Sequence, residues 1–88
     1  MVQIAFNADA DAALTALEND PSRAHLLDRV MDTLRLIGEE PKPAQVRQRR
    51  FQQLDVWGVA VKTANDDYLI LWGDSTGETI IHYIGTDL

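Results

Sequence analysis

The sequence predicts an α+β domain in which an N-terminal strand and an antiparallel helical hairpin pack on a mostly antiparallel sheet of four to five strands. Three observations predict this class. The first 40 residues contain two stretches with a helical spacing of apolar residues, and the second half contains four stretches rich in Val, Ile, Trp and Tyr. The links between successive stretches are short, which favours antiparallel neighbours.

The first half begins with a strand that runs into a helix. Apolar and polar residues alternate over residues 2–6, as in a strand with one apolar face. Apolar residues then recur at the i, i+3, i+4, i+7 spacing over residues 10–18, which predicts an amphipathic helix. Either Asn7 or Asp9 is placed to accept hydrogen bonds from the free backbone N–H groups at the start of this helix.

A second helix follows directly. Asp20 suits an N-cap and Pro21 suits the first helical position, where a missing N–H costs nothing. A further apolar stripe at helical spacing covers residues 24–37, and Gly38 is predicted to be the C-terminal cap. Because so few residues connect the two helices, they are predicted to form an antiparallel hairpin.

The second half supplies the sheet on which this hairpin can pack. Turn residues occupy 65–67 and 73–77. The strands that these turns separate are predicted over residues 46–54, 56–63, 68–73 and 79–84. The two middle strands are apolar at both odd and even positions, so both of their faces are expected to be covered, one by the helices and the other by a partner.

The composition excludes several classes of protein. Residues 1–88 are 45% apolar and 25% charged, as expected of a single folded domain. The chain has no cysteine, which excludes disulfides and thiolate metal sites. It shows no phosphate-binding glycine loop or zinc pattern, so no cofactor and no metal are expected. It also lacks a bilayer-spanning apolar run and a signal peptide, so a cytoplasmic protein without membrane contact is expected.

Positive charge is concentrated in one segment of an acidic chain. The net charge is −6, yet residues 41–62 hold five bases against one acid. These five bases are Lys42, Arg47, Arg49, Arg50 and Lys62. Arginine binds phosphate oxygens in a bidentate manner, so this basic segment is where RNA or another polyanion would bind. The alternative for the three arginines is a charged strand edge that discourages unwanted pairing.

Several segments occur in a recognisable order. They are the opening VQIAFNADADAALTALEND, a second helix ending at a proline, and then VRQRRF, WGVAVK, DDYLILW and TIIHYIG. In order and length these segments resemble RelE/ParE-type toxins over essentially the whole chain. The resemblance implies the toxin component of a type II toxin–antitoxin system, silenced by a cognate antitoxin protein. RelE-like members cut messenger RNA on the ribosome without a metal, whereas ParE-like members act on DNA gyrase.

The resemblance also implies a set of catalytic residues. His82 and Tyr83 match the C-terminal His or Tyr that several such toxins use in proton transfer, and Lys62 is the remaining base on its strand. RNA cleavage by the 2′-hydroxyl needs a base, an acid and cations beside the phosphate. The candidate endoribonuclease site therefore combines His82, Lys62 and Tyr83 with Arg47, Arg49 and Arg50 as phosphate-binding residues. The alternative for His82 is a half-buried residue of the sheet.

Other positions depart from the RelE-like pattern. Gly58, Ala60 and Leu69 stand where bases are typical, and Thr86 follows the last glycine where a further base is common. A second hypothesis is therefore a non-catalytic protein-interaction module on the same scaffold, or a ParE-like gyrase inhibitor. Exposed apolar positions on the second sheet face would suggest antitoxin capture or a homodimer.

Overall fold

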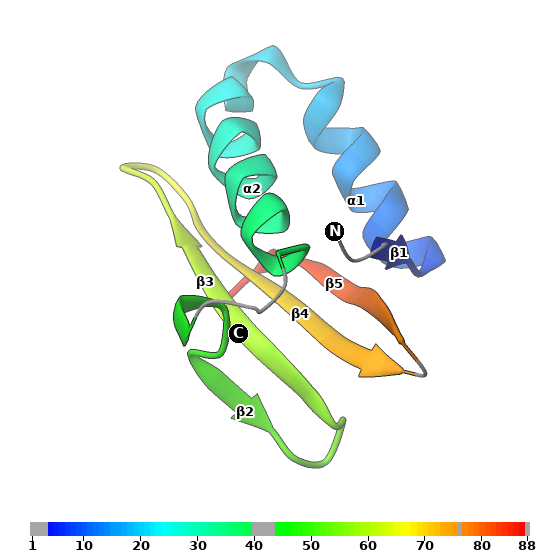
Figure 1. Ribbon diagram of the computed structural model, residues 1–88. Coiled ribbons are helices and arrows are strands. Elements are labelled where there is room, and N and C mark those ends of the chain that lie inside the picture. The colour runs from blue at the N-terminus through cyan, green and yellow to red at the C-terminus, as the bar shows by residue number, and fades with distance from the viewer. Residues whose placement is uncertain (1–3, 40–43, 76, 88) are drawn as a thin grey trace.

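The computed structural model describes residues 4–39, 44–75 and 77–87 and confirms the predicted α+β class. Figure 1 shows two α-helices above one sheet. The elements in chain order are β1 (Ile4–Phe6), α1 (Ala8–Glu18), the 3-10 turn η1 (Pro21–Arg23), α2 (Ala24–Ile37), the 3-10 turn η2 (Ala44–Val46), β2 (Arg49–Phe51), β3 (Val56–Lys62), β4 (Asp67–Ser75) and β5 (Glu78–Thr86). None of the described helices is long and apolar enough to cross a membrane.

The sheet has five strands in the order β1-β5-β4-β3-β2. Strands β2 to β5 form the predicted antiparallel meander. Strand β1 joins the far edge parallel to β5, with Ile4 opposite Thr79. The first and last strands of the chain are therefore neighbours, which brings the start of α1 next to the middle of β5 (Figure 1).

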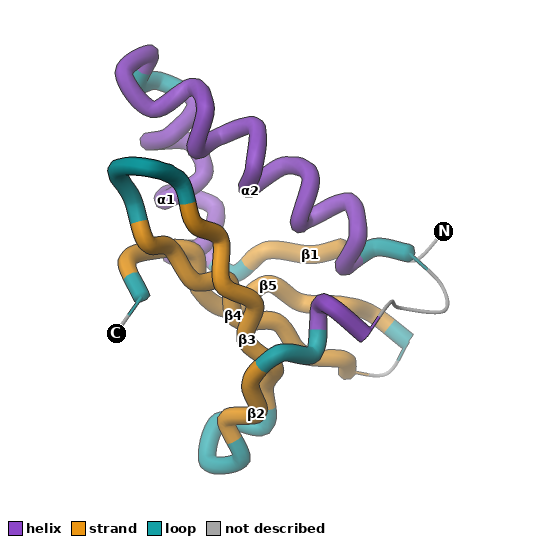
Figure 2. The backbone as a smooth tube through the Cα atoms, turned by 90° about the vertical axis from the view of Figure 1, so that its left-hand side faces the viewer, coloured by secondary structure: helices purple, strands orange, loops and turns teal. Residues whose placement is uncertain are grey.

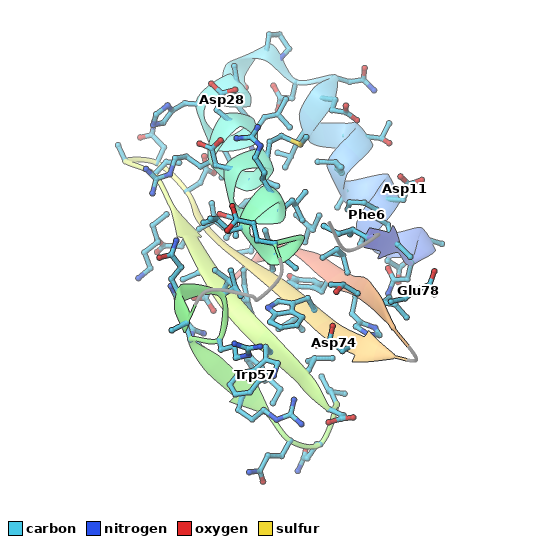
Figure 3. The ribbon with its side chains drawn as sticks, in the orientation of Figure 1. Phe6, Asp11, Asp28, Trp57, Asp74 and Glu78 are labelled. Atoms are coloured by element: carbon cyan, nitrogen blue, oxygen red, sulfur yellow. The ribbon has the colours of Figure 1, made fainter. Side chains whose placement is uncertain are left out.

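Helices α1 and α2 lie on one side of the sheet (Figure 2). Their apolar stripes, Val46 and the helix-facing residues of β3, β4 and β5 form a single core. Its buried members are Ala10, Leu17, Leu26, Val30, Leu34, Ile37, Val46, Val59, Val61, Ile70, Trp72, Ile81 and Ile84. The acidic side chains of Asp11 and Asp28 are exposed on the helices (Figure 3).

The helix ends follow the capping chemistry of the sequence. Asn7, not Asp9, is the N-cap of α1, because its side chain accepts a hydrogen bond from the backbone N–H of Ala10. Asp20 caps η1 and Pro21 begins it, so the second helix opens with a 3-10 turn before α2 starts at Ala24.

Gly38 ends α2 as predicted, but for a different reason from the expected one. Its φ is −79°, so the position does not require the left-handed conformation that glycine tolerates. A Cβ atom at Gly38 would lie 2.9 Å from Cδ1 of Ile4. The glycine therefore makes room for β1 beneath the end of the helix.

Two predicted boundaries in the second half are wrong. The strand expected over 46–54 is only Arg49–Phe51, because Val46 turns into the core, where its carbonyl accepts from Nε1 of Trp72 at 2.7 Å. The turn expected from Gly73 begins later, because β4 continues to Ser75. The φ of +81° that favours glycine occurs at Gly77.

Candidate functional site on the open face of the sheet

We call the side of the sheet opposite the helices the open face. A Cβ atom at Gly58 would contact side chains of β2 and β4, and one at Gly73 would contact side chains of β3 and β5, which places these neighbours on that side. They include Phe51, Leu69, Leu71, Val56 and His82. The open face is therefore largely apolar, with Leu69 and Val56 already buried by the chain's own side chains.

A hollow of about 300 Å³ lies on the open face where β3 and β5 pass β4. Leu54 lies at its rim, on the turn between β2 and β3, and is 64% exposed. Among the described residues, it is one of only two large apolar residues that are exposed. The lining residues are Leu54, Val56, Leu71, His82 and Tyr83. Two of the three predicted catalytic residues thus share a concave surface.

A β-bulge brings His82 and Tyr83 to the same side. Leu71 pairs with Tyr83 and Trp72 with Ile81, so His82 has no partner in the β4–β5 ladder. Consecutive residues of a regular strand point to opposite faces. Because of the extra residue, His82 and Tyr83 both line the hollow while Ile81 stays in the core.

The backbone leaves little space beside the imidazole of His82. A Cβ atom at Gly73 would lie 3.5 Å from Nε2 of His82, 3.3 Å from the carbonyl oxygen of Asp55 and 3.5 Å from Cγ1 of Val56. The turn residue Asp55 and side chains from β3 and β5 thus all approach this glycine, and the residue predicted to form a turn is instead buried within β4.

Tyr83 is held by its own strand. Its hydroxyl donates to the carbonyl of Thr86 at 2.9 Å, and a Cβ atom at Gly85 would lie 2.6 Å from that hydroxyl oxygen. The ring therefore lies over Gly85, and the hydroxyl proton is engaged with the backbone. Proton donation by Tyr83 to a ligand would first require this hydrogen bond to break.

The two arginines of β2 are neutralised within the molecule. Nη1 and Nη2 of Arg49 donate to the two carboxylate oxygens of Asp87 at 2.9 and 2.6 Å, and these hydrogen bonds raise the pKa of Arg49. Arg50 forms an ion pair with Asp55 and stacks on the ring of Trp57 at 5.2 Å. Figure 3 shows Trp57 beside β2, and Trp57 is the register partner of Arg50 in the β2–β3 ladder.

The alternation of the strand also separates these two cations. Arg49 pairs with Gly58 and so belongs to the open face, whereas Arg50 pairs with Trp57, which packs against the core on the helix side. Arg47 precedes β2 and is exposed, with its backbone N–H bound to the carbonyl of Ala44. The three arginines therefore do not form one row on a strand.

Lys62 lies at the opposite end of β3 from the hollow. It pairs with Asp67 beside the β3–β4 turn and is exposed. It is six positions from Val56, which corresponds to about 20 Å along an extended strand. The structure thus brings His82 and Tyr83 together and leaves Lys62 apart from them. Lys42, the fifth base, lies outside the described residues.

A second hollow, of about 260 Å³, lies between α1 and the ends of β4 and β5. Arg23 at its edge donates to the hydroxyl of Tyr68 at 2.7 Å and faces the carboxylates of Asp20 and Asp66 at 3.8 and 4.0 Å. With two acids beside its cation, this hollow offers an anion no net positive charge.

The sequence pointed to the polar residues of the hollow but not to its apolar ones. Leu54, Val56 and Leu71 read as ordinary strand residues, and the one available signal was an apolar leucine among the polar residues QQLD. Within the described residues, no group of three or more His, Asp and Glu side chains could hold a metal ion. We compared the chain with models of known protein families, with curated proteins and with solved structures, and none of them matches it.

Proposed function

We propose that this protein acts by binding another protein through its open face, as a non-catalytic interaction module on the RelE/ParE-like scaffold that its sequence resembles. One observation carries the proposal: Arg49 and Arg50 are each held by a carboxylate of the same chain, while the hollow itself is lined mainly by apolar side chains. Such a surface suits an apolar side chain better than a phosphate group.

Cleavage of RNA requires cations that are free to bind the phosphate, and this surface offers few of them. Charge that develops on the phosphate must be stabilised by cations at the reacting group. Binding of phosphate by Arg49 would require loss of its bidentate pair with Asp87, whose side chain is only 14% exposed. The net charge of −6 also opposes the approach of a polyanion.

The hollow favours a partner segment with one bulky apolar residue flanked by basic residues. Apolar and aromatic anchors that enter a pocket supply most of the binding energy of protein interfaces. Leu54, Val56 and Leu71 would contact such an anchor, and the anionic surface would attract its basic neighbours. Asp55 next to Leu54 is the ion-pair partner of Arg50, so this attraction comes from the net charge of −6 of the whole chain.

Peptide display tests this proposal without knowledge of the natural partner. Random peptides would be selected on the wild-type protein and then counter-selected on Leu54→Asp, which places a charge at the rim of the hollow. We expect enrichment of peptides with a bulky apolar residue between lysines or arginines. Gln53→Asp is the matched control, because it adds the same charge at a neighbouring exposed position outside the lining.

Two outcomes would contradict the proposal. One is the absence of enriched peptides, and the other is equal binding of the enriched peptides by wild type and Leu54→Asp. If the protein is the toxin that the resemblance implies, its induction should arrest growth. Leu54→Asp should then abolish the arrest, whereas Lys62→Ala, which lies far from the hollow, should preserve it.

Metal-free cleavage of RNA is the second candidate, and the side-by-side placement of His82 and Tyr83 favours it. Under the interaction proposal, purified wild type should leave single-stranded RNA intact. Asp87→Asn, which weakens the hold on Arg49, should leave it intact as well. Cleavage by wild type that is lost in His82→Ala would overturn the interaction proposal and support the nuclease.

A further inference from the structure

The bulge that places His82 is contacted by a residue from the beginning of the chain. Asn7, between β1 and α1, makes three hydrogen bonds besides the helical one that its carbonyl accepts from the N–H of Asp11 at 3.0 Å. Its backbone N–H donates to the carbonyl of Ile81 at 3.1 Å, and its side-chain Oδ1 accepts from the N–H of Ala10 at 2.8 Å. Its side-chain Nδ2 donates to the carbonyl of His82 at 2.7 Å.

These three bonds serve different parts of the fold. The backbone bond continues the pairing of β1 with β5, and the bond to Ala10 caps helix α1. The third bond reaches the bulge residue itself, which has no partner in the β4–β5 ladder. A bulge leaves its extra residue outside the regular ladder, so a side-chain donor to that residue favours the bulged register over a regular one.

Taking the hollow as the binding surface, as the proposed function does, we propose that Asn7 is a positioning residue for His82. Its amide holds the carbonyl of His82, and the bulged backbone directs the imidazole to the open face beside Tyr83. With a regular β4–β5 ladder, His82 and Tyr83 would point to opposite sides of the sheet. Asn7 thus couples the start of α1 to the shape of the hollow.

Substitution by aspartate separates the two side-chain roles of Asn7. Asn7→Asp retains an oxygen that can accept from the N–H of Ala10, and a negative charge is favourable at a helix N-terminus. It removes the amide donor and sets a second acceptor against the carbonyl of His82. Asn65→Asp, in the exposed β3–β4 turn, is the matched control with the same chemical change. Asn7→Ser offers an uncharged version that also keeps a capping oxygen.

The readout is the position of the imidazole, measured by NMR through nuclear Overhauser effects (NOEs) from His82 ring protons to the methyl groups of Val56 and Leu71. We expect these NOEs to be lost in Asn7→Asp and Asn7→Ser while the far-ultraviolet circular dichroism keeps its helical signal. Asn65→Asp should retain the NOEs. Retention of the NOEs in both Asn7 variants would overturn the inference, as would their loss in Asn65→Asp.

The NMR experiment tests the role of Asn7, and the peptide selection tests the proposed function, so one can be contradicted without the other. Loss of the His82 NOEs in the Asn7 variants, together with a failed peptide selection, would support the role of Asn7 and remove the proposed function. Unchanged NOEs in the Asn7 variants, together with selected peptides whose binding depends on Leu54, would support the proposed function and remove the role of Asn7. If Asn7→Asp fails to fold, Asn7→Ser decides, because it introduces no charge against the carbonyl of His82.

Discussion

Replacement of Gly73 by alanine tests the geometry of the hollow directly. The added Cβ atom would lie 3.3 Å from the carbonyl oxygen of Asp55 and 3.5 Å from both Nε2 of His82 and Cγ1 of Val56. Overpacking costs about 1 to 3 kcal/mol, and the smaller conformational freedom of alanine in the unfolded chain offsets about 0.4 to 1 kcal/mol. We therefore expect a net loss of about 1 kcal/mol in the free energy of unfolding.

Gly77→Ala provides the matched control. Gly77 has a φ of +81° and no atom within 4 Å of an added Cβ, so alanine there is strained without touching the hollow. This strain costs about 1 to 2 kcal/mol. Both variants should therefore unfold at a lower temperature than wild type, by about 4 to 8 °C per kcal/mol for a domain of this size.

The two variants should differ in their NMR spectra. Gly73→Ala should shift the methyl signals of Val56 and Leu54 and the imidazole signals of His82, because the backbone of Asp55 and the His82 ring must move away from the new methyl group. Gly77→Ala should leave those signals in place. The reasoning is refuted if Gly73→Ala leaves the hollow unchanged, or if both variants disturb it equally.

Two further predictions concern the scaffold. Trp72→Phe removes the donor to the buried carbonyl of Val46 and replaces a fully buried indole by a smaller ring. We therefore expect the free energy of unfolding to fall by about 2 to 4 kcal/mol. For the control Trp57→Phe we expect a fall of less than about 1 kcal/mol. Equal losses in urea unfolding would contradict the role given to this hydrogen bond. The hydrogen bond from the Ser22 hydroxyl lowers the pKa of Asp20, so the ionised carboxylate of Asp20 stabilises the folded state. This contribution to the free energy of unfolding is fully present above the ordinary pKa of 3.8. It is lost as the pH falls below that value through the folded-state pKa. Asp20→Asn should therefore lose less melting temperature than wild type between about pH 5 and pH 2, and equal losses would show that Asp20 makes no such contribution.

Local chemistry was enough to predict most elements of the fold. The helical spacing and the capping residues predicted both α-helices, and the apolar alternation and turn residues predicted the meander of β2 to β5. These features depend on contacts between residues close in sequence. The parallel pairing of β1 with β5 could not be read in this way, because it joins opposite ends of the chain.

The candidate site shows the same division. His82 and Tyr83 stood out as polar residues able to transfer protons, and the structure places both in the hollow. The pairing of Arg49 with Asp87 was not predicted, because 38 positions separate the two residues. The same limit applies to the bond between Asn7 and His82, which are 75 positions apart.

By itself, the sequence determined which segments form helices and strands and which residue types could carry chemistry, because periodicity and capping act within a few residues. Only the tertiary structure decided that the β2 arginines face their own carboxylates and that His82 leaves the regular ladder to join an apolar hollow. Strand register and long-range hydrogen bonds depend on how distant segments pack, and one extra residue in β5 was sufficient to change which face of the sheet carries the imidazole.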